Sequence, residues 1–262
     1  HMLDLRPVRA FLDSEHEAWA CTAAKFASAE LARRPEPVDD DAGRIEARDV
    51  LSAMGAAGLL DPIGTLDLRA CCLAREAIAA ASPLADAVWA LQGLGITPLL
   101  LAGSDRLREQ WAPGALAGEI MSAFAMTEPD AGSDVASMKT RAVRDGDDYV
   151  LDGHKWLISN AGIADYYVVF ASTDPEAGSR GISAFLVPAE TEGLTFAGAQ
   201  VMSAPHPLGE LQLTGCRVSA TNRIGEEGRG FMLGMATLDQ LRPTVGAAAC
   251  GMAQRAIDEA LA

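Results

Sequence analysis

The chain is short of aromatic residues and of basic residues. Phe, Trp and Tyr make up 5% of its 262 residues, and 21 Lys and Arg stand against 36 Asp and Glu, a formal net charge of −15. This balance leaves no broad basic face, so we expect neither nucleic-acid binding nor attachment to an anionic membrane. A phosphorylated ligand would have to be held by a few local cations and by backbone N–H groups.

Metal-binding cysteine patterns and long apolar runs are also missing. The five cysteines form no CxxC pair and no metal-ligand spacing with the four histidines, so we expect no metal and buried free thiols. The longest apolar run, residues 93–103, is too short to span a bilayer and contains Pro98. His1-Met2 resembles a cloning remnant, and no signal peptide follows it, so we expect a cytoplasmic protein.

Helical periodicity dominates the first part of the chain and predicts an all-helical domain over residues 1–122. The expected helices cover residues 14–34, 39–58 and 65–81, a segment from Pro83 that is interrupted around Pro98, and residues 106–111, with a loop at 114–118.

An alternating pattern then replaces the helical one and predicts a β-domain over residues 123–228. The expected strands cover residues 149–151, 154–158, 166–171, 182–188, 194–197 and 208–218. Asp152-Gly153 is expected to form a two-residue hairpin turn. Short strands at this spacing indicate an antiparallel sandwich or barrel. A Rossmann fold is disfavoured, because the glycine-rich segment 225–230 lacks the GxGxxG spacing.

A helical pattern resumes at Phe231 and continues to Ala262. The apolar side is marked by Phe231, Met235, Leu238, Val245, Cys250 and Ile257, and the small residues Gly246, Ala247, Ala248 and Gly251 would let another helix approach. A lone helix cannot bury such a stripe. Residues 229–262 are therefore expected to be the first helix of an incomplete C-terminal bundle, whose partners come from further along the polypeptide or from another chain.

The segment 127–134, Thr-Glu-Pro-Asp-Ala-Gly-Ser-Asp, has the composition of a ligand-binding loop. Its hydroxyls, its glycine and its free N–H groups could cradle a polar heterocycle or a pyrophosphate. Trp156 and Ser159 add an aromatic ring and a hydroxyl on a predicted strand. By spacing alone, a capped interdomain turn and a half-buried strand explain the same residues.

Three blocks together resemble the acyl-CoA dehydrogenase family: residues 124–134 (FAMTEPDAGSD), 153–160 (GHKWLISN) and 238–243 (LDQLRP). The resemblance implies an α+β multidomain fold with N-terminal helices, a middle β-domain and a C-terminal four-helix bundle. It also implies FAD between the β-domain and the bundle, an acyl-CoA substrate, an electron-transferring flavoprotein or similar acceptor, and a homodimer or homotetramer.

By the same resemblance, the FAD contacts are Phe124, Ala125, Met126, Thr127, Gly132, Ser133, Trp156, Leu157, Ile158 and Ser159. Thr127 would hydrogen-bond the flavin ring, and Ser159, where the family more often has Thr, would stand near flavin N5. The implied substrate contacts are Ser133, Arg180, Asp239 and Arg242.

The implied reaction is α,β-dehydrogenation of an acyl thioester to the 2-enoyl thioester, with a carboxylate as general base. In a minority of the family the base precedes the arginine of the third block, and here that position is Leu241. Asp239 lies two residues away and would point elsewhere on a helix. We therefore expect no catalytic base in this segment and no activity from this chain alone. The alternatives are a flavin oxidase or monooxygenase, a carrier-protein thioester dehydrogenase, the non-catalytic subunit of a split enzyme, or a flavin-less scaffold.

Two departures from the family pattern bear on the pocket. Leu157 stands where the family usually has Trp, and Trp156 precedes it, a shift that would reverse the face of a regular strand. Residues 204–209, Ala-Pro-His-Pro-Leu-Gly, replace a Gly-x-Arg-x-Ser segment, and His206 between its prolines is expected to be structural.

Overall fold

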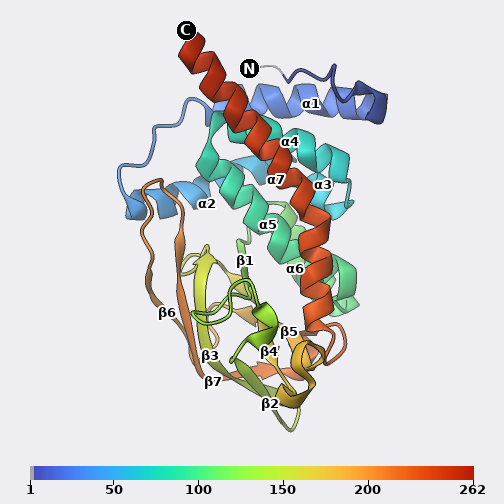
Figure 1. Ribbon diagram of the computed structural model, residues 1–262, viewed down its shortest axis with the longest axis vertical. Coiled ribbons are helices and arrows are strands. Elements are labelled where there is room, and N and C mark those ends of the chain that lie inside the picture. The colour runs from blue at the N-terminus through green and yellow to red at the C-terminus, as the bar shows by residue number, and fades with distance from the viewer. Residues whose placement is uncertain (1–2) are drawn as a thin grey trace.

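The computed structural model describes residues 3–262, with a helical half above a β-sheet in the view of Figure 1. The helices are α1 (Ser14–Phe26), α2 (Asp40–Ala56), α3 (Asp61–Gly64), α4 (Leu68–Ala81), α5 (Pro83–Ala102), α6 (Asp105–Leu116) and α7 (Gly230–Leu261). Short helical turns are η1 (Arg9–Phe11), η2 (Ala27–Leu31), η3 (Val135–Ser137), η4 (Pro175–Gly181) and η5 (Ala220–Asn222). Asp39, Asp67, Ser82 and Ser104 cap α2, α4, α5 and α6 by accepting backbone N–H groups.

The sheet is mostly antiparallel and has the order β6-β7-β3-β2-β4-β5-β8, with β1 beside β4. Its strands are β1 (Ser122–Ala125), β2 (Arg141–Asp145), β3 (Asp148–Ser159), β4 (Tyr166–Ser172), β5 (Ile182–Pro188), β6 (Leu194–Ala199), β7 (Leu208–Ser219) and β8 (Arg223–Ile224). Only the pairings of β4 with β1 and β2 are parallel among residues 3–262. The predicted succession of helices, mostly antiparallel strands and a final helix is confirmed.

Two arginines of α2 tie the helices to the sheet. Arg48 donates both terminal nitrogens to the carboxylate of Asp165, at 2.6 and 2.9 Å, and that carboxylate also accepts the N–H of Met121. Arg44 donates to the carbonyl oxygens of Ala161 and Leu208. These contacts fix the junction where β1 begins, and β1 leads directly into the 127–134 loop.

The central helix α5 is continuous, so the predicted interruption at Pro98 is wrong. Side-chain donors satisfy carbonyls near the proline: Thr97 bonds Gly93 O, and Tyr166 of β4 bonds Gly95 O. By length and composition α5 could also cross a membrane, contrary to the prediction from the 93–103 run. However, 67% of its most apolar window is buried within the structure.

Two helix boundaries also differ from the prediction. Leu66 has φ +54° and breaks the predicted 65–81 helix, so that α4 begins at Leu68 with Asp67 as its cap. Helix α6 continues through Gly114, which was predicted to lie in a loop. A β-carbon on Gly114 would lie 2.6 Å from the side chain of Ile120, so the glycine serves close packing here rather than a turn.

The predicted hairpin turn at Asp152-Gly153 is wrong, because β3 runs unbroken through both residues. The turn lies earlier, at Gly146-Asp147, between the paired residues Asp145 and Asp148. Gly153 is instead required by close packing, since a β-carbon there would lie 2.3 Å from Oγ1 of Thr140.

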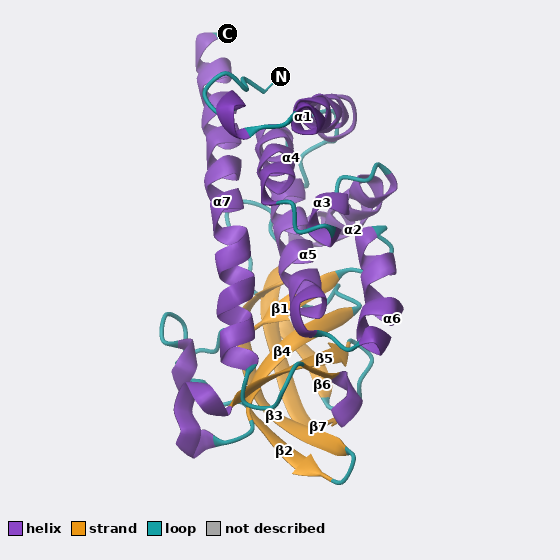
Figure 2. Cartoon of the chain, turned by 90° about the vertical axis from the view of Figure 1, so that its right-hand side faces the viewer, coloured by secondary structure: helices purple, strands orange, loops and turns teal. Residues whose placement is uncertain are grey.

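Helix α7 runs beside the sheet and then across α5 and α4, as both views show (Figures 1 and 2). Its buried face is not the predicted apolar stripe, since the side chains of Val245 and Ile257 are 57% and 52% exposed. The packed face consists of Gly230, Leu233, Gly234, Thr237, Leu241, Thr244, Ala248 and Gly251. Gly251 permits the predicted close approach, because a β-carbon there would meet Glu76 O of α4 at 2.1 Å.

Candidate functional site

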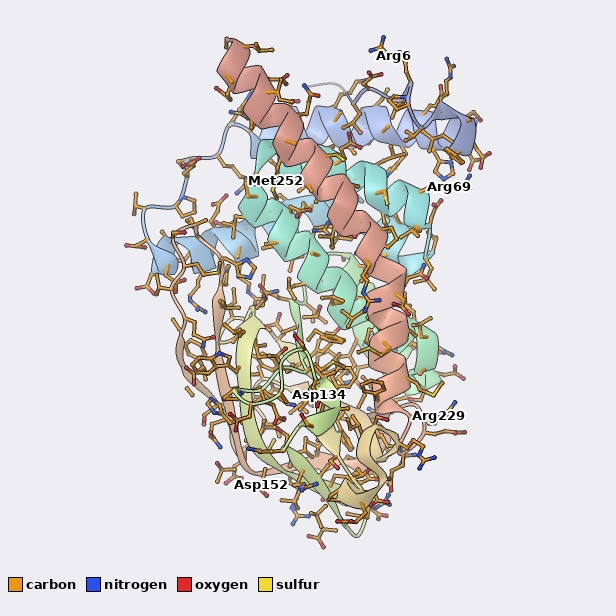
Figure 3. All side chains as sticks on the ribbon, viewed as in Figure 1. Arg6, Arg69, Asp134, Asp152, Arg229 and Met252 are labelled. Atoms are coloured by element: carbon orange, nitrogen blue, oxygen red, sulfur yellow. The ribbon has the colours of Figure 1, made fainter. Side chains whose placement is uncertain are left out.

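A cavity of about 380 Å³ lies between the 127–134 loop and the first turns of α7. We call it the loop cavity. It is lined by Phe124, Met126, Thr127, Gly132, Ser133, Asp134, Val135, Ala136, Phe231, Met235, Leu238 and Arg242. Figure 3 places Asp134 on the loop after β1, beside the lower part of α7. Two of the three sequence blocks thus converge on one cavity, although more than a hundred residues separate them.

The loop cavity combines an apolar wall with free polar groups. Phe124, Phe231 and Met235 are half-buried and supply apolar surface. No protein hydrogen bond among residues 3–262 engages the hydroxyls of Thr127 and Ser133, so both can bind a ligand. Apolar walls with a few convergent polar groups are typical of small-molecule sites.

A buried carboxylate holds the loop in place. Glu128 Oε1 accepts hydrogen bonds from Nζ of Lys155 at 2.9 Å and from the N–H and hydroxyl of Thr140, and Oε2 accepts the N–H of Lys139 at 2.6 Å. Nζ of Lys155 also donates to Met126 O. The backbone on both sides of Thr127 is therefore tied to β3 and to the chain before β2.

The pKa values of both members of this pair are lowered, which favours the carboxylate of Glu128 but disfavours the ammonium of Lys155. Full burial lowers the pKa of Lys155 to about 8, against the opposing charge of Glu128. Burial raises the pKa of Glu128, but the charge of Lys155 and the hydrogen bonds from Thr140, Lys155 and Lys139 outweigh it, so the net shift is downward. Sequence reasoning missed this pair, although a lysine within an otherwise apolar strand pattern is a signal for a buried partner.

The end of β3 does not line the loop cavity. One extra residue lies between the pairs Lys155–Leu211 and Ile158–Gly209, so β3 has a bulge at Trp156 and Leu157. The predicted reversal of faces between Trp156 and Leu157 assumed that side chains alternate strictly along a regular strand. The bulge breaks that alternation, so the prediction does not apply. Leu157 has φ +54° and is 50% exposed, while Ile158 is buried. Trp156 contributes its backbone, whose N–H donates to Thr127 O at 2.9 Å.

A smaller apolar space of about 90 Å³, which we call the inner chamber, adjoins the loop cavity. Leu238 and Arg242 line both spaces. The other residues around the inner chamber are Arg75, Trp89, Ala90, Leu94, Leu241, Thr244 and Val245. Ala90 and Leu94 of α5 supply an apolar wall to the inner chamber.

The floor of the inner chamber is a buried ion pair. Arg75 donates to both carboxylate oxygens of Asp86, at 2.8 and 2.7 Å, and to Oγ1 of Thr244 at 2.9 Å. Burial raises the pKa of Asp86 against the opposing effect of Arg75. Because the guanidinium is already neutralised, the chamber suits an uncharged apolar group.

The predicted charged contacts separate in the structure. Arg242 lines both spaces, whereas Asp239 lines neither and forms an exposed ion pair with Arg242. Arg180 is exposed on η4 and lines neither space. Ala125 is fully buried on β1 and also lies outside both. The structure thus brings together Phe124, Met126, Thr127, Gly132, Ser133 and Arg242 from the predicted site.

Within residues 3–262, no buried carboxylate lines the loop cavity. Asp134 is the one acidic lining residue, and it is exposed. Leu241 stays apolar at the position where some family members are expected to carry the base.

No cluster of metal-binding side chains occurs in the described part of the chain. A further groove of about 450 Å³, between Leu3, Leu5 and α1, contains no predicted site residue.

Sequence-family models for the acyl-CoA dehydrogenase N-terminal domain and middle domain match residues 13–119 and 123–216. This chain belongs to the acyl-CoA dehydrogenase family. A probable acyl-CoA dehydrogenase of Mycobacterium leprae is 38% identical over 259 residues, which are 95% of this chain and 66% of the relative. The chain therefore spans just under two thirds of that acyl-CoA dehydrogenase.

Two further relatives have named substrates. A cyclohex-1-ene-1-carbonyl-CoA dehydrogenase of Syntrophus aciditrophicus is 36% identical over 242 residues, 88% of this chain and 58% of that protein. The structure of butyryl-CoA dehydrogenase from Megasphaera elsdenii superposes with a TM-score of 0.86 at 28% identity, covering 95% of this chain and 68% of the other.

The residues around the loop cavity fit a flavin of this family. A β-carbon on Gly132 would meet nothing within 4 Å, so a planar ligand can approach that backbone closely. The free hydroxyls of Thr127 and Ser133 supply hydrogen bonds beside it. The cavity of about 380 Å³ accommodates one ring-sized part of a larger ligand.

Proposed function

We propose that this chain provides the flavin- and thioester-facing half of an FAD-dependent acyl-CoA dehydrogenase. The carrying observation is the loop cavity, where Thr127 and Ser133 face Arg242 of α7 across an apolar space. Bound FAD would accept the hydride from the β-carbon. Thr127 and Ser133 would bind its ring and the nearby CoA. Ser159 does not line the loop cavity, but by the family resemblance it would lie beside the ring where the ring extends past the cavity to the end of β3, which the Trp156 N–H joins to Thr127 O.

The size of the inner chamber favours a substrate with a compact acyl group. Its volume of about 90 Å³ equals that of roughly three water-sized groups, which matches a chain of about four carbons or a small ring. Arg75, which lines the chamber and is held by Asp86, would block further extension toward α4. The butyryl group named for one of the similar structures is of this size, whereas the cyclohexenecarbonyl group named for another relative is larger.

We further propose that the general base comes from outside residues 1–262. The absence of a buried carboxylate around the loop cavity of the described residues supports this. A base that removes a weakly acidic α-proton needs desolvation, and exposed Asp134 lacks it. Intact mass of the protein isolated from its source separates two origins. A mass well above 27.4 kDa indicates a further segment of the same polypeptide, whereas 27.4 kDa indicates a separate subunit.

The test is anaerobic titration of the FAD-loaded protein, as its source makes it, with butyryl-CoA. Bleaching of the flavin absorption without oxygen supports dehydrogenation. Binding of FAD without bleaching by any CoA thioester favours the alternatives with the same fold, an oxidase, a monooxygenase or a carrier-protein thioester dehydrogenase. If the protein failed to bind FAD, the flavin-less scaffold would be the remaining alternative function.

An electron-transferring flavoprotein as acceptor, assembly into dimers or tetramers and a cytoplasmic location remain part of the proposal. The formal charge of −15 supports an acceptor with a basic docking face.

A further inference from the structure

Ser159 and His206 form a hydrogen-bonded pair that the proposed function does not use. Oγ of Ser159, at the end of β3, lies 2.7 Å from Nε2 of His206, in the loop before β7. The residues are 47 positions apart, and both belong to segments where the sequence departs from the family pattern.

The loop that carries His206 is anchored on both sides. The N–H of Asn160 donates to Pro207 O at 2.7 Å. On the other side, Pro205 packs against Gly43 of α2, where an added β-carbon would lie 3.2 Å from the proline ring. The backbone on both sides of His206 is therefore held close to the end of β3.

The two nitrogens of His206 face different surroundings. Nε2 faces Ser159, whereas Nδ1 has no hydrogen-bond partner among residues 3–262 and is not fully buried. The charged group that acts on this histidine is Asp40 of α2, whose carboxylate is itself bound by Arg44 at 2.7 Å. Burial lowers the pKa of His206 below 6.5, and Asp40 opposes that shift.

The proton on the imidazole decides which way the serine hydroxyl points. A bare Nε2 accepts the hydroxyl proton, so Oγ presents only lone pairs to its surroundings. An Nε2–H donates to Oγ, which frees the hydroxyl proton to point into the site. A doubly protonated ring permits only the second arrangement.

We propose that His206 is a positioning residue: through its hydrogen bond it decides whether Ser159 donates to a bound flavin ring or accepts from it. This inference rests on the proposed function, because it takes Ser159 as a contact of the ring. His206 acts through Ser159 and does not itself touch the flavin.

The experiment is a pH titration of the FAD-loaded protein between about pH 5 and pH 8, with the visible absorption spectrum and the dissociation constant of FAD as readouts. The unaltered protein is expected to show one titration below pH 6.5, with an affinity change of about fivefold, the size of one neutral hydrogen bond. His206→Gln and Ser159→Ala should abolish the titration. Ser159→Thr, which keeps the hydroxyl, should retain it.

His154→Gln is the matched control. His154 also lies on β3 and binds a partner, Glu210, at 2.7 Å, but it stands before the bulge and away from Ser159. The control should titrate like the unaltered protein. In a Ser159→Ala background, His206→Gln should have no further effect on FAD affinity.

A titration that survives in His206→Gln, or an effect of His206→Gln without Ser159, overturns the inference. Binding of FAD with no titration in the unaltered protein overturns it while leaving the proposed function intact. No binding of FAD by the unaltered protein overturns both.

Discussion

Lys155 and Glu128 form a buried ion pair with Nζ and Oε1 2.9 Å apart, directly beneath the loop that lines the cavity. Neither side chain touches the loop cavity. Glu128 nevertheless lies next to Thr127, and Lys155 bonds the carbonyl of Met126. The pair therefore fixes the position of the predicted flavin contacts from behind.

Removing one member of this pair is expected to destabilise the fold strongly. Glu128→Gln leaves the buried Lys155 ammonium without its carboxylate, and we expect a loss of about 3–5 kcal/mol in the free energy of unfolding. The double variant Lys155→Met/Glu128→Gln should lose less than the sum of the single changes, because neither residue then leaves an unpaired buried charge. Urea unfolding of Glu128→Gln, of Lys155→Met and of the double variant measures these losses, and strictly additive losses would mean that the two residues do not act as a pair.

The pair also predicts a specific pH dependence of stability. The pKa of Lys155 is about 8 in the folded protein, against an ordinary value of 10.5. Between these values the unfolded chain binds more protons than the folded one, so this site's contribution to stability rises with pH. The free energy of unfolding of the unaltered protein, minus that of Lys155→Met, should increase from about pH 8 to about pH 10. A difference that is constant or decreases would show that Lys155 does not have a depressed pKa.

Leu157 offers a direct test of the bulge at the end of β3. Its φ of +54° and half-exposed side chain hold an apolar group where the family usually has tryptophan. Leu157→Trp should tighten FAD binding by about three- to tenfold, the range expected for one added aromatic stacking contact. The change should also quench flavin fluorescence. Unchanged affinity and fluorescence would place the flavin ring away from position 157.

The order of helices and strands could be predicted from hydrophobic periodicity, and three short blocks were sufficient for the family. The packed face of α7 could not be predicted, because it includes Thr237 and Thr244, and polar residues are expected on the solvent-exposed side of a helix. Their hydroxyls bond Leu233 O and Leu241 O of the same helix, so both side chains can be buried.

The site was only partly predictable for a related reason. The sequence of the 127–134 loop predicted Thr127 and Ser133 as ligand contacts, and both residues line the loop cavity in the structure. It could not show the inner chamber, whose floor joins Arg75 to a threonine 169 positions away. A strand pattern likewise assumes strict alternation, and the bulge beside Leu157 breaks that alternation.

The inner chamber predicts a limit on acyl size that a single substitution should lower. Ala90→Leu adds bulk to a space of about 90 Å³, so butyryl-CoA binding should weaken about tenfold while acetyl-CoA binding changes little. Ala87→Leu is the matched control, because Ala87 lies one turn away on α5 and lines neither space. Calorimetric titration with the two thioesters gives the comparison. If Ala90→Leu weakened the binding of both thioesters equally, or if Ala87→Leu had the same effect as Ala90→Leu, the acyl group would lie elsewhere.

Gly132→Leu tests most directly whether the loop cavity binds the flavin and the thioester. A side chain at position 132 meets no protein atom within 4 Å at its β-carbon, so the melting temperature should stay the same while the cavity is filled. Gly246→Leu on α7, which has equally open space, is the control. We expect the dissociation constant of FAD to rise at least about tenfold in Gly132→Leu and to stay unchanged in Gly246→Leu. Full FAD affinity in a folded Gly132→Leu variant would contradict the account.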